Sequence, residues 1–120
     1  MASILAVDDS PSMRKLVAST LAGVGHQVVE AEDGMAALRV AEGRSVQLVI
    51  TDVNMPNMDG LTLIGRLRGI PSYKFTPILV LTTEMDPAKK QQAKASGATG
   101  WIVKPFDPET LLATIRKVVG

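Results

Sequence analysis

Polar residues stand directly after several of the short apolar segments of this chain. The first segment is followed by Asp8 and Asp9, the third by Asp52, the fourth by Thr82 and the fifth by Lys104. If these residues meet, the three carboxylates repel one another, and the group is stable in its ionised form only with a cation beside it. Oxygen ligands with no His or Cys nearby favour a hard ion, and an open site of this kind suits Mg²⁺ with several waters retained.

The same set of residues is equipped to bind a phosphoryl group. A cation and Lys104 can neutralise charge on the transferring oxygens while Thr82 donates a hydrogen bond. A carboxylate can itself act as the nucleophile and form an aspartyl-phosphate, and Asp52, central in the group, is the best candidate. Taken singly, each residue has an ordinary structural interpretation as a helix cap, a strand end or a solvated charge. Their joint placement favours the chemical one.

Five apolar runs and five helical segments alternate along the chain and must position these residues. Runs of three to five residues rich in Val, Ile and Leu are typical of strands buried on both faces. We expect strands at Ile4–Val7, Gln27–Ala31, Leu48–Thr51, Ile78–Leu81 and Trp101–Val103.

Capping residues mark where the helices begin. Ser10-Pro11, Asp86-Pro87 and Asp107-Pro108 each pair a capping side chain with proline at the first helical position. Asp33 caps a helix from near Gly34 to Glu42, Asp59-Gly60 starts one that ends near Gly69, and the Asp86 helix stops at Gly97. The periodicity predicts as inward-facing Met13, Leu16, Val17, Thr20, Leu21, Val24, Ala37, Leu38, Ala41, Leu63, Ile64, Leu67, Leu111, Leu112, Ile115, Val118 and Val119.

Strict alternation of strand and helix predicts an α/β fold, doubly wound, with a five-stranded parallel sheet, five helices on its two faces and right-handed crossovers. The strand order 2-1-3-4-5 fits a chain of this size, and it makes the first and third strands neighbours. Asp8, Asp9 and Asp52 then converge at one edge, with Thr82 and Lys104 from the next strands. His26, the only histidine, lies at the opposite end of the sheet, which excludes a zinc site.

Length and composition limit the classes of protein that remain. The 120 residues, 46% of them hydrophobic, predict one domain covering residues 1–120. A net charge of +1 and only four aromatic residues argue against nucleic-acid binding. No cysteine is present, which excludes a disulfide or thiolate metal site and suits the cytoplasm. A membrane span needs about 20 apolar residues in succession, and we expect neither a span nor a secretory signal.

Four separated motifs resemble those of response-regulator receiver domains, especially the receivers of chemotaxis, and the resemblance covers the whole chain. The matching segments are Ala6-Val7-Asp8-Asp9-Ser10, Asp52-Val53-Asn54-Met55-Pro56-Asn57-Met58-Asp59-Gly60, Thr82 and Lys104-Pro105-Phe106. The resemblance implies a flavodoxin-like fold and a stand-alone phosphoacceptor switch that catalyses only its own phosphotransfer and slow self-dephosphorylation.

The resemblance also implies roles for individual residues. A histidine kinase would phosphorylate Asp52 with Mg²⁺ bound by Asp52 itself, by Asp9 directly, by Asp8 through water and by the backbone carbonyl of Asn54. Thr82 and Lys104 would contact the phosphoryl oxygens, and the bond from Lys104 to proline would be cis. A phosphatase is a further partner that such receivers use.

Two residues depart from the family pattern. Trp101 stands where such receivers usually carry Tyr or Phe, a ring that swings inward as the threonine moves toward the phosphoryl group; simple edge-strand packing is the other interpretation. Thr83 replaces the more usual alanine and narrows access to the phosphorylation site. Glu84 and Asn54 match the chemotaxis pattern at positions that influence self-hydrolysis in such proteins, so we expect an effect on phosphoryl lifetime.

The resemblance places the output surface on the fourth helix, the fifth strand and the fifth helix. We expect the protein to be a monomer. The partner would be a flagellar motor switch protein or another effector. Residues expected on that face are Lys89, Lys90, Lys94, Trp101 and Lys117. A lysine-rich helix can also be only a solvated face, but basic side chains equally steer an acidic partner.

Other functions remain open at this point. The receiver could serve another phosphorelay, act as a phosphate sink or be part of a larger regulator. A flavin-binding protein of the same fold needs a phosphate-binding first loop and aromatic walls, which Asp8-Asp9 and the scarce aromatics do not supply. A haloacid-dehalogenase-like phosphatase places its two acids two residues apart, whereas here they are adjacent.

Overall fold

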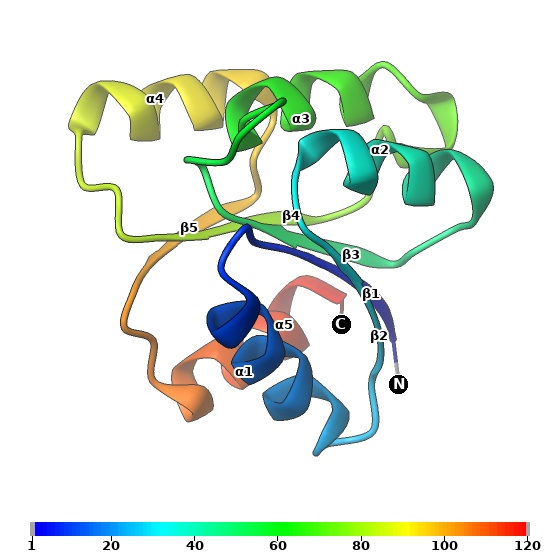
Figure 1. Cartoon of the computed structure of the whole chain (residues 1–120), viewed down its shortest axis with the longest axis vertical. Helices are drawn as coiled ribbons and strands as arrows, with labels where there is room; N and C mark the ends of the chain where they lie inside the picture. Colours follow the sequence, from blue (N-terminus) through cyan, green and yellow to red (C-terminus); the bar gives the residue numbers. More distant parts are fainter. Residues whose placement is uncertain (1, 120) are drawn as a thin grey trace.

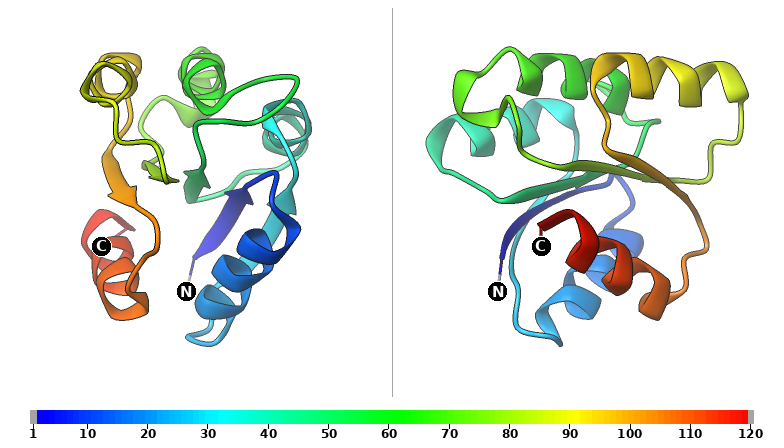
Figure 2. Two further views of the ribbon diagram at one scale, coloured as in Figure 1. Left: turned by 60° about the vertical axis from the view of Figure 1, so that its left-hand side comes forward. Right: turned by 180° about the vertical axis from the view of Figure 1, so that it is seen from behind.

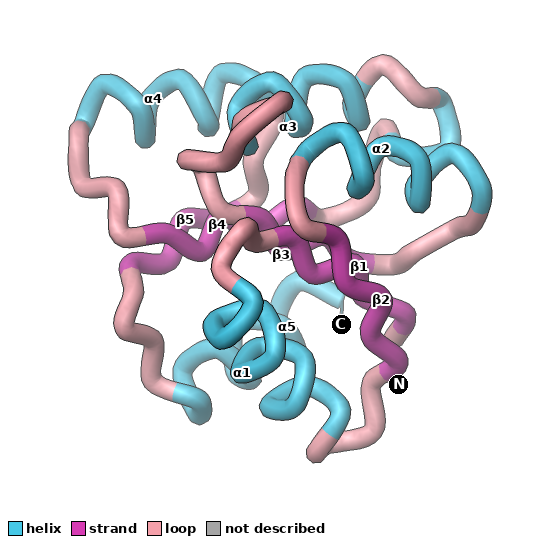
Figure 3. Tube along the Cα trace, in the orientation of Figure 1, coloured by secondary structure: helices cyan, strands magenta, loops and turns pink. Residues whose placement is uncertain are grey.

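Strands and helices alternate along the chain in the computed structural model, which describes residues 2–119 (Figures 1 and 3). The elements are β1 (Ser3–Val7), α1 (Pro11–Ala22), β2 (Gln27–Ala31), α2 (Gly34–Gly43), β3 (Leu48–Thr51), α3 (Gly60–Arg68), the short 3₁₀ helix η1 (Pro71–Tyr73), β4 (Ile78–Thr82), α4 (Pro87–Ser96), β5 (Gly100–Val103) and α5 (Pro108–Val119). The predicted strands and helices are all present, with ends shifted by a residue or two. Only η1 was not predicted.

The five strands form one parallel sheet in the order β2-β1-β3-β4-β5, as predicted, so the flavodoxin-like fold is confirmed. Val7, the last residue of β1, pairs with Ala31 of β2 and Thr51 of β3. Thr82 at the end of β4 pairs with Val103 of β5. Because these ends lie side by side, the residues that follow them gather at one edge of the sheet.

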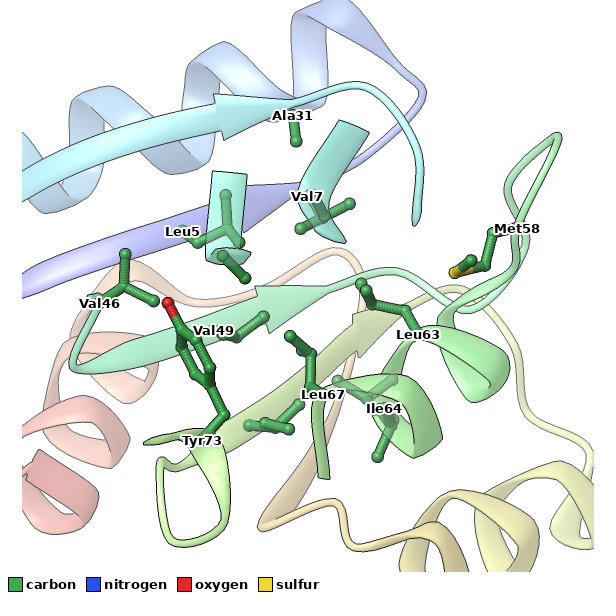
Figure 4. Packing of buried hydrophobic residues seen from close by; sticks show 14 of the residues in the cluster. Leu5, Val7, Ala31, Val46, Val49, Met58, Leu63, Ile64, Leu67 and Tyr73 are labelled. Carbon is green, nitrogen blue, oxygen red and sulfur yellow. The ribbon is translucent and has the colours of Figure 1, made fainter. Parts of the chain in front are cut away.

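Helices cover both faces of the sheet, with α2, α3 and α4 on one side and α1 and α5 on the other (Figures 1 and 2). Successive strand side chains point to opposite faces, so Leu5 and Val7 pack under α2 and α3 while Ile4 and Ala6 pack over α1 and α5. Leu63, Ile64 and Leu67 of α3 belong to the first of these layers together with Val49 (Figure 4).

Capping side chains begin the helices where the sequence predicted. The Ser10 hydroxyl accepts from the Met13 N–H at the start of α1, and Asp33, Asp59 and Asp86 accept from backbone N–H groups at the starts of α2, α3 and α4. Each bond satisfies a donor that the helix cannot satisfy itself.

Three of the residues predicted to face inward are exposed, and those predictions are wrong. Leu16 is 50% exposed, Val24 53% and Val119 37%. In α1 the fully buried stripe is limited to Val17 and Leu21. Val24 follows the end of that helix, and Val119 closes α5, where helical periodicity no longer decides which side a residue faces.

The helix α4 has few buried apolar residues and a polar contact at its carboxyl end. Ala93 is its only fully buried residue among the ten. At its carboxyl end, Gly97 adopts a left-handed conformation (φ 110°), and its carbonyl accepts from the guanidinium of Arg68 at 2.8 Å. The same guanidinium also donates to the carbonyls of Tyr73 and Thr76, and burial lowers the pKa of Arg68.

Candidate functional site

Three carboxylates meet where β1 and β3 end. Asp8, Asp9 and Asp52 each offer an oxygen atom, and these atoms lie within 4.8 Å of one another. Asp8 and Asp52 are buried, with 5% and 9% exposure, whereas Asp9 is exposed. The convergence predicted from strand order is therefore confirmed. Three carboxylates and no nitrogen or sulfur donor form a set that fits a hard divalent cation such as Mg²⁺.

Lys104 lies between the two buried carboxylates. Its ammonium Nζ is 2.6 Å from Asp8 Oδ2 and 2.9 Å from Asp52 Oδ2. Burial alone lowers the pKa of Lys104, but its hydrogen bonds to Asp8 and Asp52 and the charges of both outweigh that effect and raise the pKa. The lysine therefore stays charged and offsets part of the repulsion between the aspartates.

Backbone hydrogen bonds fix the other oxygen of each buried carboxylate. Asp8 Oδ1 accepts from the Ser10 N–H at 2.9 Å, and Asp52 Oδ1 accepts from the Val53 N–H at 2.6 Å. The second oxygen, Oδ2, is in both cases the one that faces Lys104. Both carboxylates are thus oriented before any ligand arrives.

The start of α3 packs directly against the backbone of Asp52. The Gly60 N–H donates to the carbonyl of Val53 at 2.8 Å, and a Cβ at residue 60 would lie only 2.0 Å from the carbonyl oxygen of Asp52. Only glycine permits this approach, so Gly60 helps to place the carboxylate.

Thr82 is the fully buried last residue of β4. Its hydroxyl oxygen accepts from the Glu84 N–H at 3.1 Å, and its carbonyl accepts from the Lys104 N–H at 2.8 Å. The peptide bond between Lys104 and Pro105 is cis, as the resemblance implied. Thr83, next in the chain, is exposed.

Asn54, Glu84 and Lys89 form a second polar group, which we call the rim. Lys89 Nζ is 3.1 Å from Glu84 Oε1 and 3.4 Å from Asn54 Oδ1, and Asn54 Nδ2 donates to Glu84 Oε1 at 3.3 Å. The hydrogen bond from Lys89 lowers the pKa of Glu84, together with bonds from the Asp86 N–H and Asn54. The sequence placed Lys89 on the output face and gave no sign of these contacts.

Three of the other output-face residues line a groove between α4 and β5. The groove has a volume of about 400 Å³, and Lys90, Lys94 and Trp101 line it. Trp101 is half-buried on the edge strand and packs against the apolar layer beneath α4. Lys117 is exposed on α5.

Three further hydrogen bonds were not foreseen, two from Arg14 and one from Asn57. Arg14 Nη1 donates to the carbonyl of Asp8 at 2.7 Å while its Nε pairs with Glu30 at 3.1 Å, which joins β1 to the edge strand. Asn57 Nδ2 donates to Asp33 Oδ2 at 2.7 Å. Hydrogen bonds from the Ala36 N–H and from Asn57 lower the pKa of Asp33. Long polar side chains can reach many partners, so sequence spacing alone does not reveal such pairs.

Comparison with known proteins gives this arrangement a family. A model described as the response regulator receiver domain matches residues 4–116. The chain belongs to the response-regulator receiver family.

The most informative relatives of this receiver are chemotaxis proteins. It is 40% identical over 119 residues to the chemotaxis protein CheY homolog of Campylobacter jejuni, covering 98% of this chain and 92% of that one. Over 119 residues it is 38% identical to CheY1 of Helicobacter pylori, covering 98% and 96%. The structure of CheY4 of Vibrio cholerae matches with a TM-score of 0.94 and 53% identity, covering 98% of each chain. The receiver is thus of the CheY type, consistent with a chemotaxis response regulator. In residues 2–119, no helix is long and apolar enough to cross a membrane.

Proposed function

We propose that this receiver is a stand-alone cytoplasmic response regulator whose Asp52 accepts a phosphoryl group from a histidine kinase. The observation that carries the proposal is the Lys104 ammonium between Asp8 and Asp52, with Asp9 beside them. This places one oxygen of a buried, pre-oriented carboxylate next to a fixed cation and a metal-binding set. An electrostatic site of this kind favours transfer of a phosphoryl group.

In the proposed reaction an Asp52 oxygen attacks phosphorus and forms a new P–O bond. The P–N bond of the phosphohistidine breaks, and its electron pair stays on the ring nitrogen; the ring leaves as neutral imidazole because its other nitrogen carries a proton. Asp8, Asp9, Asp52 and the backbone carbonyl of Asn54 would hold Mg²⁺, which when bound neutralises charge on the phosphoryl oxygens. Lys104 donates a hydrogen bond to one of these oxygens, and Thr82 donates to another once its hydroxyl turns from the Glu84 N–H. Self-dephosphorylation is hydrolysis of the aspartyl-phosphate: water attacks phosphorus, the Asp52 O–P bond breaks, and phosphate and a proton leave.

The proposed output follows from the position of Thr82. Because its hydroxyl is bonded to the backbone of Glu84, turning it toward a phosphoryl group alters the loop that leads into α4. Phosphorylation then shifts a two-state equilibrium of the α4–β5 groove and Trp101. The relatives named for chemotaxis support a flagellar motor switch protein as effector. We infer a phosphatase as the partner that ends the signal, and a relay or phosphate-sink role is the alternative.

The test is intact mass after incubation with acetyl phosphate and Mg²⁺. We expect the wild-type chain to gain one phosphoryl group and the Asp52→Asn variant to gain none, with the gain lost in EDTA. An unchanged wild-type mass, or equal labelling of the variant, would contradict the phosphoacceptor role. Phosphorylation-dependent binding to a motor switch peptide would separate chemotaxis from a relay or sink.

A further inference from the structure

Lys89 differs from the other lysines of α4 in what it contacts. Lys90 and Lys94 line the groove beside Trp101, the face to which the output is assigned. Lys89, three residues into the helix, instead reaches the loop after β3 at Asn54 and the loop after β4 at Glu84. It is therefore a direct side-chain link between α4 and the two loops that leave the phosphorylation site.

Both partners of Lys89 stand two residues beyond groups that the proposed reaction uses. Asn54 follows Asp52 by two residues and supplies the proposed metal-binding carbonyl. Glu84 follows Thr82 by two, and its N–H donates to the Thr82 hydroxyl. Asn54 and Glu84 also bond each other at 3.3 Å. The rim is thus a closed three-membered network that joins α4 to the loops that follow Asp52 and Thr82.

The charges of the rim matter because phosphodonors are anions. Asp9 is exposed at this edge, and Glu84 adds a second carboxylate whose side chain is 20% exposed. Within the rim, Lys89 supplies the positive charge that balances Glu84. Without Lys89, an approaching donor meets uncompensated negative charge before it reaches Lys104. Fields of this kind act on association rates and weaken with salt.

We propose that Lys89 is a positioning residue that holds Glu84 and Asn54 together and neutralises Glu84, so that anionic phosphodonors reach Asp52. This inference rests on the proposed phosphorylation of Asp52. It assigns a specific residue of α4 to the loading of the switch, whereas its neighbours on the same helix face the output groove.

The experiment measures the rate of phosphorylation by acetyl phosphate, by intact mass, at low and high salt. We expect Lys89→Gln to slow the reaction about 1.5-fold to fivefold at low salt, the range for a partly exposed ion pair, and the deficit to shrink at high salt. Glu84→Gln should speed the reaction, the double variant should return near the wild-type rate, and Lys89→Arg should retain it. The less charged donor phosphoramidate should show a smaller deficit.

Lys90→Gln is the matched control, because it removes the same charge from the next residue of α4. Equal slowing by Lys89→Gln and Lys90→Gln would overturn the inference, as would a deficit that salt does not change or a double variant that remains as slow as Lys89→Gln. Urea unfolding of each variant checks that the fold is intact. If wild-type Asp52 is not phosphorylated at all, the proposed function fails as well; if it is and only the Lys89 pattern is missing, this inference alone fails.

Discussion

Replacing Lys104 by glutamine should destabilise the folded receiver strongly, because Asp8 and Asp52 would then face each other unscreened. The side chains are 7% exposed for Lys104 and Asp8 and 11% for Asp52. Removing one partner of a buried ion pair costs about 3–5 kcal/mol. In the variant, Asp8 and Asp52 each keep one backbone hydrogen bond, and the exposed Asp9 lies beside them. We therefore expect the free energy of unfolding to fall by an amount near the lower limit, about 3 kcal/mol.

The loss of stability in Lys104→Gln should be smaller when Mg²⁺ is present. In the wild-type chain the Lys104 ammonium opposes a second cation between the same carboxylates, whereas in Lys104→Gln the metal supplies the missing charge. If the affinity rises tenfold, saturating Mg²⁺ recovers about 1.4 kcal/mol more in the variant than in the wild type.

Urea unfolding in EDTA and in Mg²⁺ measures both quantities. Lys117→Gln, which removes a charge from the exposed side of α5, is the control and should change the free energy of unfolding by less than about 0.5 kcal/mol. A loss below about 1 kcal/mol for Lys104→Gln in EDTA would refute the reasoning, since a typical buried pair costs several times more. Equal stabilisation of both chains by Mg²⁺ would refute the competition between ammonium and metal.

Two further substitutions test the supports of the site. Gly60→Ala places a Cβ 2.0 Å from the Asp52 carbonyl oxygen, a backbone atom that cannot rotate away, so the free energy of unfolding in urea should fall by about 2–3 kcal/mol. Gly65→Ala in the same helix, where a Cβ would have nothing within 4 Å, should instead raise it by up to about 1 kcal/mol. Equal effects of the two substitutions would contradict the steric argument. Asp33→Asn keeps a good helix cap but removes a charge whose pKa is lowered by the Ala36 N–H and Asn57. A lowered pKa means that the carboxylate stabilises the fold above its ordinary pKa and loses that contribution as the pH falls through the folded value. The stability difference between wild type and Asp33→Asn should therefore shrink on acidification, and a difference independent of pH would show that the charge plays no part.

The fold and the centre of the site could be predicted because strong local signals fix them. Capping residues such as Ser10 and Asp86 mark helix starts, and short apolar runs mark strands buried on both sides. Once alternation sets the strand order, the residues after each strand must meet at one edge. Asp8, Asp52 and Lys104 were found in this way, and their contacts agree with it.

The contacts that could not be predicted depend on where long side chains point. Lys89 and Lys90 are adjacent in sequence, yet one joins the rim and the other lines the groove. Arg68 is held by backbone carbonyls, partners that leave no trace in residue identity. Leu16 was misplaced because periodicity shows which residues share a helix face, but not how wide a stripe of that face is covered.

The weak apolar attachment of α4 has a consequence for how such a receiver changes over evolutionary time. With Ala93 its only fully buried residue, most positions of the helix can be replaced at a cost of about 0.5 kcal/mol or less each. Apart from Lys89, which reaches Glu84 and Asn54, the acidic site and the core impose few demands on that surface. A duplicated copy of the gene could therefore acquire a new partner through changes in α4 alone, while the chemistry and the fold stay as they are.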